Sequence, residues 1–587
     1  MSNCILSITT SGHGVGASLC LEGKIVAANT LERLTRKKYD IMLPISKNDL
    51  STFGWNANPT TYLNNLDLPF DLENDYSSVD FNEIESFHLL IDHVLNAGGV
   101  ELKDVDSVTY SYRHNESVKN YFMKKNSKIN FIIPEHHFAH ACQAYLPSPF
   151  EDAAIMVVDG QGVPLARTGY DQLSGCLAYG KGNSIETLWE FPVNDSLGGF
   201  YSYITKLCGF KTNEECKTMG LASYGNSEYY DDYKKYIKFG KYKFNLRNLR
   251  RFLPEKHLYS LGRYYSFFGR FKQRGKTDPY TDDYINIAFA GQKVVEEVMI
   301  YIANWLYEHT GSKNLCISGG VGLNCVANYK VLENTKFENI FVYPNSGDNG
   351  LPVGQALYLY NLVEGNPRRY IADHDYMGKS YTSEDVSKAV DKYRNKEGLS
   401  IRKFDDSLML CDEMAKHIAE GKITSWWQGK SEYGPRALGN RSILADPRRK
   451  DMKDILNLRV KFRENFRPFT PSVLKERASE YFTLDIDSPF MLLAPYVQPG
   501  KAEIIPSITH VDNTARVQTV TKAVNERYYD LIKAFEKITG VPVLLNTSFN
   551  VAGEPIVETP EDAIKCFLST DIDVLGIDQF FLSKVRQ

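Results

Sequence analysis

The residues best suited to chemistry are two histidines and an aspartate that occur close together. His136 and His140 are four residues apart, so on a helix they share one face and can bind one ion. Asp159 follows the apolar run 153–158, which predicts a strand with this carboxylate at its end, where sites are commonly built. Two imidazoles and a carboxylate suit a divalent metal such as iron(II), manganese or zinc. A buried, hydrogen-bonded histidine pair is the alternative.

Glycine-rich segments at the ends of predicted strands favour the metal site over that alternative. They comprise residues 12–16, 159–162, 318–320 and 346–350. Backbone N–H groups without side chains can approach phosphates closely, which indicates strand–turn–strand cradles. A Walker A loop is absent, because Gly429-Lys430-Ser431 and Gly378-Lys379-Ser380 lack its upstream glycine. A Rossmann fingerprint is disfavoured, since a strand-like run follows residues 12–16.

A second group of residues suits anion binding. Its cationic members are Arg436, Arg441, Lys461, Arg463, Arg467 and Arg516. Guanidinium groups bind phosphate or carboxylate through two parallel hydrogen bonds. A solvated surface is the alternative for any one of them, but their Gly, Pro and apolar neighbours favour a pocket. Polar groups able to hold a planar amide follow at Asn546, Thr547, Ser548 and Asn550.

The elements that must position these residues form a weak internal repeat. Residues 4–31 predict a strand at 4–8, the glycine loop, a strand, a turn and a strand, and the same order returns from residue 152. This repeat predicts a duplicated α/β domain with a cleft between its halves. We place a boundary near 362–380, which gives domains at 1–365 and 380–587. In the second, a strand at 541–545 opens into a polar loop, and Thr559-Pro560-Glu561-Asp562 predicts a helix start.

The overall composition sets the class of protein. The 587 residues are 43% hydrophobic and 24% charged, as in ordinary soluble proteins. No run approaches the roughly 18 apolar residues of a membrane span, and the N-terminus lacks the regions of a signal peptide. The ten cysteines are scattered without a CxxC pair, which indicates reduced thiols. We therefore expect a cytoplasmic protein, of a bacterium or a phage-infected host, without a membrane partner.

Ordered motifs along nearly the whole chain carry a resemblance to a known family. They are Ser11-Gly12-His13, Glu32-Arg33 with Arg36-Lys37-Lys38, residues 136–141, residues 217–222, residues 318–324, Ser346-Gly347-Asp348, residues 433–441, residues 513–518 and residues 545–550. Together they resemble the NodU/CmcH/TobZ family of O-carbamoyltransferases. The resemblance implies an N-terminal domain of the actin/sugar-kinase (ASKHA) type and a C-terminal YrdC-like α/β domain.

The resemblance also implies a reaction and a set of site residues. The C-terminal domain would join carbamoyl phosphate with ATP as carbamoyl adenylate, and the N-terminal metal site would pass the carbamoyl group to an acceptor hydroxyl. The metal, expected to be iron(II), would be held by His136, His140, Asp159 and Asp348. The substrates and the adenylate would be bound by Lys217, Gly319, Gly320, Asn324, Arg436, Arg441, Arg463, Arg467, Arg516, Asn546 and Ser548.

Two residues are candidates for catalysis. An alcohol is a poor nucleophile at neutral pH, and His13, in a glycine loop expected to face the cleft, is our candidate base. The alternative for His13 is a turn residue. Lys38 is the second candidate, from its motif. Tyr39 stands where the family pattern has histidine, so no acceptor contact is assigned to it. The metal could polarise the carbamoyl oxygen or orient the adenylate, and enclosure between two domains would limit hydrolysis.

A basic, aromatic-rich segment at residues 234–276 bears on the acceptor. It contains 14 Lys or Arg against one acid, Glu255, so it carries +13 within a chain of net charge −4. Eleven aromatic residues are interleaved. Phosphate neutralisation and base stacking are what binding of single-stranded or flipped-base nucleic acid requires. We therefore expect the acceptor to be a hydroxymethylated pyrimidine in DNA, such as 5-hydroxymethylcytosine.

Other readings of this segment stay open. It could be a helical insertion whose aromatic side chains pack inward while its lysines stay solvated. The acceptor would then be a small-molecule natural product or a sugar alcohol. A third hypothesis is a non-catalytic nucleic-acid-binding protein on a transferase scaffold, against which the intact motifs argue. We allow for a homodimer, although the sequence does not determine the oligomeric state.

Overall fold

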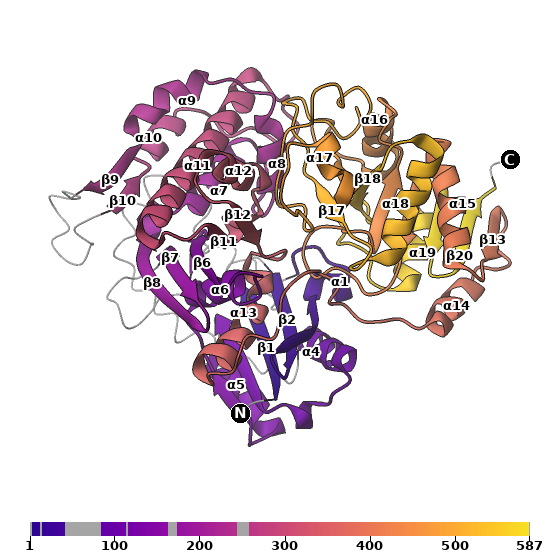
Figure 1. Ribbon diagram of the computed structural model, residues 1–587, viewed down its shortest axis with the longest axis horizontal. Coiled ribbons are helices and arrows are strands. Elements are labelled where there is room, and N and C mark those ends of the chain that lie inside the picture. The colour runs from indigo at the N-terminus through magenta and orange to yellow at the C-terminus, as the bar shows by residue number, and fades with distance from the viewer. Residues whose placement is uncertain are drawn as a thin grey trace.

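The computed structural model describes residues 3–11, 14–40, 84–112, 115–162, 173–242 and 257–585 (Figure 1). The candidate base His13 and residues 243–256 of the basic segment lie outside these ranges. No helix within the described ranges is both long and apolar enough to cross a membrane.

The first N-terminal sheet has five strands in the order β3-β2-β1-β4-β5. Its strands are β1 (Cys4–Ser11), β2 (Gly14–Leu21), β3 (Lys24–Thr30), β4 (Ser107–Tyr112) and β5 (Asn130–Ile132). The strands β1, β2 and β3 pair antiparallel, whereas β4 lies parallel to β1 and β5 lies parallel to β4. Every side chain of β1 is buried, so this strand is covered on both faces.

The second sheet repeats this topology. Its strands are β6 (Asp152–Val158), β7 (Leu173–Lys181), β8 (Ser184–Pro192), β11 (Asn314–Ser318) and β12 (Asn339–Val342). Their order is β12-β11-β6-β7-β8, with an antiparallel β6-β7-β8 meander followed by two parallel strands. Because order and direction match those of the first sheet, the predicted duplication and the ASKHA-type architecture are confirmed.

The structure corrects the predicted glycine loop at residues 12–16. Gly14 and Gly16 belong to β2, where they pair with Ser11 and Thr9 of a β1 strand that extends beyond the expected end at residue 8. A Cβ built on Gly16 would lie 2.1 Å from the backbone oxygen of Asn349. A side chain cannot fit at that distance, so this glycine allows the Asn349 turn to approach β2.

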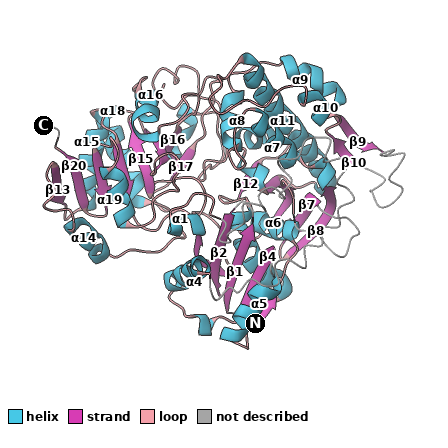
Figure 2. Ribbon diagram, turned by 180° about the vertical axis from the view of Figure 1, so that it is seen from behind, coloured by secondary structure: helices cyan, strands magenta, loops and turns pink. Residues whose placement is uncertain are grey.

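Helices fill the space between and around the two sheets. α6 packs on β6, β7 and β11, while α13 packs on β1, β2 and α6. The N-terminal helices are α1 (Leu31–Thr35), α4 (Glu85–Gly98), α5 (Asn115–Lys125), α6 (His136–Tyr145), α7 (Leu197–Leu207), α8 (Glu215–Ala222), α9 (Glu228–Tyr233), α10 (Tyr264–Phe268), α11 (Asp282–Thr310), α12 (Cys325–Asn334) and α13 (Leu351–Leu357). A hairpin of β9 (Lys238–Tyr242) and β10 (His257–Ser260) lies at the end of the molecule opposite the C-terminal domain (Figures 1 and 2).

The C-terminal domain is built on an eight-stranded mixed sheet of order β13-β20-β19-β14-β15-β18-β16-β17. Its strands are β13 (Leu399–Lys403), β14 (Thr424–Trp427), β15 (Arg441–Ala445), β16 (Thr470–Leu474), β17 (Gln518–Val520), β18 (Val543–Ser548), β19 (Val574–Ile577) and β20 (Phe580–Lys584). Its helices are α14 (Ser383–Asp391), α15 (Ser407–Ala419), α16 (Met452–Leu456), α17 (Ala478–Tyr481), α18 (Glu526–Thr539) and α19 (Pro560–Leu568). The predicted C-terminal α/β domain is confirmed.

Two local expectations for this domain have different outcomes. The helix start is confirmed, because Thr559 and Asp562 form a reciprocal capping box at α19. The expected loop after residue 545 is wrong in part, since β18 continues to Ser548 and pairs with β15 there. Asn546 and Ser548 are therefore held by a sheet.

The N- and C-terminal domains contact each other directly. Nη2 of Arg33 donates to the backbone oxygen of Gly434 at 2.8 Å, and Nη1 of Arg36 donates to that of Ile556 at 2.6 Å. One cluster of buried apolar side chains runs through both domains. The boundary proposed near residues 362–380 stays a prediction; it falls before α14, which begins at Ser383.

Candidate metal centre and anion pocket

The first turn of α6 gathers histidines because a glutamate caps the helix. The carboxylate of Glu135 accepts hydrogen bonds from the backbone N–H groups of His137 and Phe138, at 3.0 and 2.5 Å. A carboxylate at a helix N-terminus satisfies otherwise unpaired donors and opposes the helix dipole. The helix predicted for His136 and His140 is thus present, and both imidazoles are buried.

The two aspartates reach the histidines from neighbouring strands. Asp159 follows β6 directly, and Asp348 lies in the turn after β12. β6 and β12 both pair parallel with β11, so the segments that follow them emerge at the same edge of the sheet. The backbone N–H of Gly320 donates to Oδ1 of Asp159 at 3.0 Å and holds that carboxylate in place.

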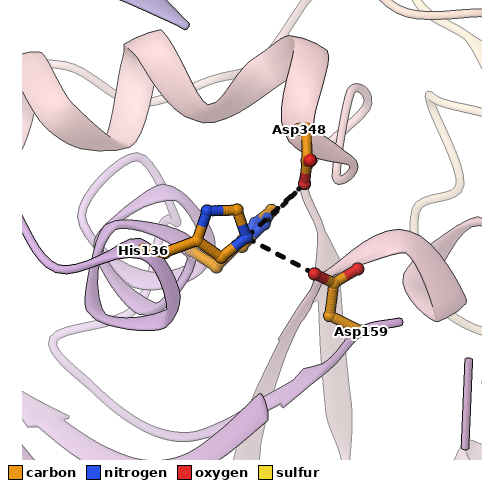
Figure 3. Close-up of side chains that lie close together, drawn as sticks. His136, Asp159 and Asp348 are labelled. Carbon is orange, nitrogen blue, oxygen red and sulfur yellow. Dashed lines mark hydrogen bonds and ion pairs between the residues drawn. The ribbon is translucent and has the colours of Figure 1, made fainter. Parts of the chain in front are cut away.

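The four side chains form a compact buried cluster. Nε2 of His136 lies 3.4 Å from Oδ2 of Asp159 and 3.6 Å from Oδ1 of Asp348 (Figure 3). Nε2 of His140 lies 3.3 Å from the same oxygen of Asp348. One donor atom from each residue falls within 4.8 Å of the others, so together they could hold a metal ion.

Opposite charges inside this cluster shift its pKa values. Burial lowers the pKa of His136, but the carboxylates of Asp348 and Asp159 outweigh burial and raise it to about 9. Burial raises the pKa of Asp159 and of Asp348, yet the neighbouring histidines hold both below their usual range. The metal-free cluster therefore keeps a proton on His136 at neutral pH, in the place where a cation would offset the carboxylates.

His137 was not singled out by the sequence reasoning, and the structure places it beside the cluster. Its imidazole is buried, and Nε2 lies 3.8 Å from Oδ2 of Asp159. Neither of its ring nitrogens has a hydrogen-bond partner among the described residues. Burial and the charge of His136 hold its pKa well below the usual value, so this ring is neutral. The four-residue spacing rule does not include it, because adjacent residues on a helix do not share a face and the approach of His137 to Asp159 depends on tertiary packing.

Arginines of the C-terminal domain form a second site. Burial and the nearby Arg436 lower the pKa of Arg516 to about 9, while burial and Arg467 lower that of Arg463 to about 9. The Nε atoms of Arg436 and Arg516 are buried without a hydrogen-bond partner among the described residues. Like charges packed together are costly, so these arginines form a candidate anion pocket.

Lys461 and Ser548 meet at one side of this pocket. Nζ of Lys461 donates to Oγ of Ser548 at 3.3 Å and to Oδ1 of Asn550 at 2.8 Å. Burial and the charge of Arg463 hold the pKa of Lys461 well below its usual value. The exposed Lys38 of the N-terminal domain also lowers the pKa of Lys461. The charge of Lys38 therefore adds to the positive charge at this site.

The N-terminal domain contacts the C-terminal domain beside these arginines. Sγ of Cys216 on α8 lies 3.9 Å from Nη2 of Arg467. The next residue, Lys217, is a predicted ligand-binding residue, but its Nζ forms ion pairs with Glu214 at 2.9 Å and Glu464 at 3.0 Å. Because Glu464 belongs to the C-terminal domain, Lys217 joins the two domains beside the arginines.

Arg441 has a different environment from the other arginines. It is fully buried and donates to the backbone oxygens of Gln428, Asn440, Gly429 and Glu558 at 2.7–3.2 Å. Its guanidinium group also lies 4.0 Å from the ring centroid of Trp427. These contacts connect loops of the domain, so Arg441 is held by the protein itself.

Gly320 and Asn324, predicted to contact the adenylate, and the neighbouring Gly319 of the predicted binding set also have local roles, and that of Gly320 is its bond to Asp159. Gly319 has φ +87°, and a Cβ there would lie 2.2 Å from the backbone oxygen of Val158. The side chain of Asn324 caps α12 by accepting from the N–H of Ala327 at 3.0 Å. Their contacts with an adenylate stay predictions.

Tyr39, the residue that departs from the family pattern, is held by the protein. Its hydroxyl donates to the backbone oxygen of Asn213 at 2.8 Å, and Nζ of Lys38 lies 5.2 Å from its ring centroid. Burial raises the pKa of Tyr39, so the hydroxyl stays protonated.

Some aromatic side chains in the described part of the basic segment pack inward, whereas Phe239 and Tyr265 are exposed. Tyr259 and Phe268 are buried, and the ring of Phe239 lies 4.6 Å from that of Tyr301. Of the cations, Lys234 pairs with Asp231 at 2.8 Å. The alternative of a packed insertion therefore fits these residues, whereas residues 243–256 lie outside the described ranges.

Arginine substitutions should separate structural from ligand-binding roles. We expect Arg441→Met to lower the free energy of unfolding by at least about 3 kcal/mol, because buried carbonyls lose their donors. Arg516→Met should leave the ligand-free stability unchanged or raise it by about 1 kcal/mol, since it relieves repulsion between like charges. Urea unfolding of the ligand-free proteins measures both. Equal losses in the two variants would show that Arg516 is structural.

Comparison with known proteins agrees with this arrangement. The carbamoyltransferase N-terminus model matches residues 4–357, and the carbamoyltransferase C-terminus model matches residues 415–584. Uncharacterized protein sll1178 of Synechocystis is 34% identical over 99% of this chain and 97% of its own length. Nodulation protein NolO of Bradyrhizobium diazoefficiens is 37% identical over 76% of this chain and 78% of that protein. Nodulation protein NolNO of Sinorhizobium fredii is 38% identical over 78% of this chain, which spans 64% of that longer protein.

Solved structures show only weak similarity. The crystal structure of T. kodakarensis HypF aligns over 62% of this chain and 48% of its own with 13% identity and a TM-score of 0.32. The assignment therefore rests on the family models and relatives. Because both models match and cover most of the sequence, the chain belongs to the carbamoyltransferase family that its motifs resemble, and it is an O-carbamoyltransferase.

Proposed function

We propose that this enzyme forms carbamoyl adenylate from carbamoyl phosphate and ATP in the arginine pocket. Water would split carbamoyl phosphate into carbamate and phosphate, and the carbamate oxygen would displace pyrophosphate from ATP. An acceptor hydroxyl would then take the carbamoyl group beside the cluster of His136, His140, Asp159 and Asp348, with release of AMP and the hydroxyl proton. The observation that carries the proposal is the group of partly buried arginines whose Nε atoms lack partners among the described residues. Phosphate oxygens supply the negative charge and the acceptor atoms that these guanidinium groups require.

Asn546 supports recognition of the carbamoyl group. Its Nδ2 donates to the backbone oxygen of Ala437 at 3.1 Å and to Oγ of Ser472 at 3.0 Å, which fixes the direction of the amide. Its Oδ1 is buried without a partner among the described residues. A carbamoyl NH2 group is a donor that suits this oxygen, whereas a second phosphate would not.

The transfer step is proposed at the histidine–aspartate cluster. His136, His140, Asp159 and Asp348 would hold a divalent metal, for which we propose iron(II), and the bound metal would polarise the carbamoyl oxygen. Contacts of Lys217 with Glu464 and of Arg36 with Ile556 close the domain junction and help to exclude water from the adenylate. His13 stays our candidate for the base that takes the hydroxyl proton.

The two half-reactions should respond to different variants. We expect Arg516→Met to lower carbamoyl-phosphate-dependent pyrophosphate release from ATP by about 100-fold or more, because the anion loses charge-assisted hydrogen bonds. His136→Gln should retain this release and lose transfer to the acceptor. Pyrophosphate release and acceptor labelling, measured on the same preparations, test both expectations. Loss of pyrophosphate release in His136→Gln with wild-type release in Arg516→Met would reverse the assignment of the two sites.

Metal binding should release a proton. The pKa of His136 is about 9 in the metal-free cluster, so at pH 7 the ring is protonated and must lose its proton before its nitrogen binds a cation. We therefore expect metal affinity to rise with pH and to level off above about pH 9. Calorimetric titration with a divalent metal in buffers of different ionisation enthalpy measures the protons released. An affinity independent of pH between 6 and 9, with about zero protons released, would contradict this expectation.

For the acceptor we propose the hydroxymethyl group of a pyrimidine in DNA. The +13 charge of residues 234–276 supports it through attraction to phosphates. The inward packing of Tyr259 and Phe268 gives no support to base stacking by these two rings. That packing instead favours a second candidate, a small natural-product or sugar alcohol.

Transfer of a carbamoyl label distinguishes these acceptors. We expect label from carbamoyl phosphate, with ATP and iron(II), in DNA that contains 5-hydroxymethylcytosine and none in unmodified DNA. Binding of this DNA should weaken steeply between about 50 and 200 mM salt, because counterions are released from phosphates. An aminoglycoside serves as the parallel acceptor. Label in the aminoglycoside alone would reject DNA and retain the transferase, while pyrophosphate release without any label would reject both acceptors.

A further inference from the structure

The two histidines of the cluster are supported unequally by their surroundings. Nδ1 of His140 lies 2.9 Å from Oε1 of Gln143 and 3.2 Å from Oγ of Ser318, and all three side chains are fully buried. Nδ1 of His136 has no hydrogen-bond partner among the described residues. His140 is therefore the ligand candidate whose orientation the protein fixes.

A backbone carbonyl determines the direction of the Gln143 amide. Nε2 of Gln143 donates to the backbone oxygen of Asn345 at 2.8 Å. Because a carbonyl oxygen can only accept, the NH2 group must face Asn345 and Oε1 must face His140. Oγ of Ser318 donates to the same Oε1 at 2.5 Å, which agrees with this direction.

The direction of the amide in turn selects one tautomer of His140. Oε1 of Gln143 can only accept, so the proton of the neutral imidazole belongs on Nδ1 and the lone pair on Nε2. Nε2 is the atom that lies 3.3 Å from Oδ1 of Asp348 within the cluster. Metal-binding histidines commonly donate their second N–H to such an acceptor, which holds the ring and increases its basicity.

Gln143 also connects α6 with the turn that carries Asp348. Asn345 precedes Asp348 by three residues, so the amide that orients His140 also bonds the backbone that leads to the aspartate. A Cβ on Gly350 would lie 1.8 Å from the backbone oxygen of Asn345 and 2.5 Å from Nε2 of Gln143. Only glycine at that position lets the turn pack against this hydrogen bond.

We infer that Gln143 is a positioning residue of the metal centre, which fixes the tautomer of His140 and the place of the Asp348 turn. The inference rests on the metal site of the proposed function. It assigns no contact between Gln143 and a substrate; Gln143 acts through His140. Its loss should therefore change metal binding more than it changes folding.

Cobalt(II) binding to the full chain tests this role. Co(II) reports its ligand geometry through visible absorption, and its affinity can be measured by competition with a chelator. The variants are Gln143→Met, which removes the acceptor at similar length, and Gln143→Glu, which retains an acceptor oxygen. The control is Gln498→Met, because Nε2 of Gln498 also bonds a backbone oxygen, that of Ser479 at 3.1 Å, away from the cluster.

We expect Gln143→Met to bind Co(II) about 10- to 100-fold more weakly, with an altered spectrum. Gln498→Met should stay close to the parent protein. Gln143→Glu, which keeps the acceptor for His140 but loses the donor to Asn345, should lose less affinity than Gln143→Met. Equal affinity and spectra for Gln143→Met and the parent, or an equal loss in Gln143→Glu, would overturn the positioning role. If Gln143→Met does not fold, Gln143→Asn, which withdraws the oxygen by one methylene, replaces it with the same expectation. A parent protein that binds no Co(II) would instead refute the metal site itself, and this inference with it.

Discussion

Parallel pairing of β6 and β12 with the same central strand, β11, is the constraint on which the candidate metal centre depends. It brings the residues after both strands to one edge of the sheet, and so sets Asp159 beside Asp348. Two buried carboxylates this close require positive charge, and α6 supplies it from the facing layer through His136. The fold thus places two carboxylates where they need a nearby positive charge, even before a ligand is bound.

The arginine pocket shows the opposite imbalance at the junction of the two domains. Arg516 and Arg463 have lowered pKa values because burial and like-charged neighbours disfavour their charged forms. The histidine–aspartate cluster suits a cation, which agrees with the proposed metal. The arginine pocket suits an anion, which agrees with the proposed phosphate groups. Burial of charged groups at these two sites lowers the stability of the fold. The apolar cluster that runs through both domains offsets this cost.

Local spacing was sufficient for the parts of the site that depend on one element. The i, i+4 rule predicted that His136 and His140 would share a helix, and the strand pattern placed Asp159 correctly. Asp348 came from the family resemblance, because 189 residues separate it from Asp159 and no periodicity relates them. Arg441 and Arg516 look alike in sequence and differ only in their partners, which depend on tertiary packing. His137 was missed for the same reason.

The glycines of β2 change how conservation in this family should be interpreted. An alignment that showed Gly14 and Gly16 to be invariant would invite their assignment to nucleotide binding. Their neighbour in the structure is the Asn349 turn, which follows Asp348 directly, so selection at these positions would protect the clearance of the loop that carries a proposed metal ligand. A relative with a larger residue in place of Gly14 or Gly16 would then be expected to have its Asn349 turn, and with it the candidate metal centre, in a different place. This expectation does not depend on the nucleotide that the relative uses.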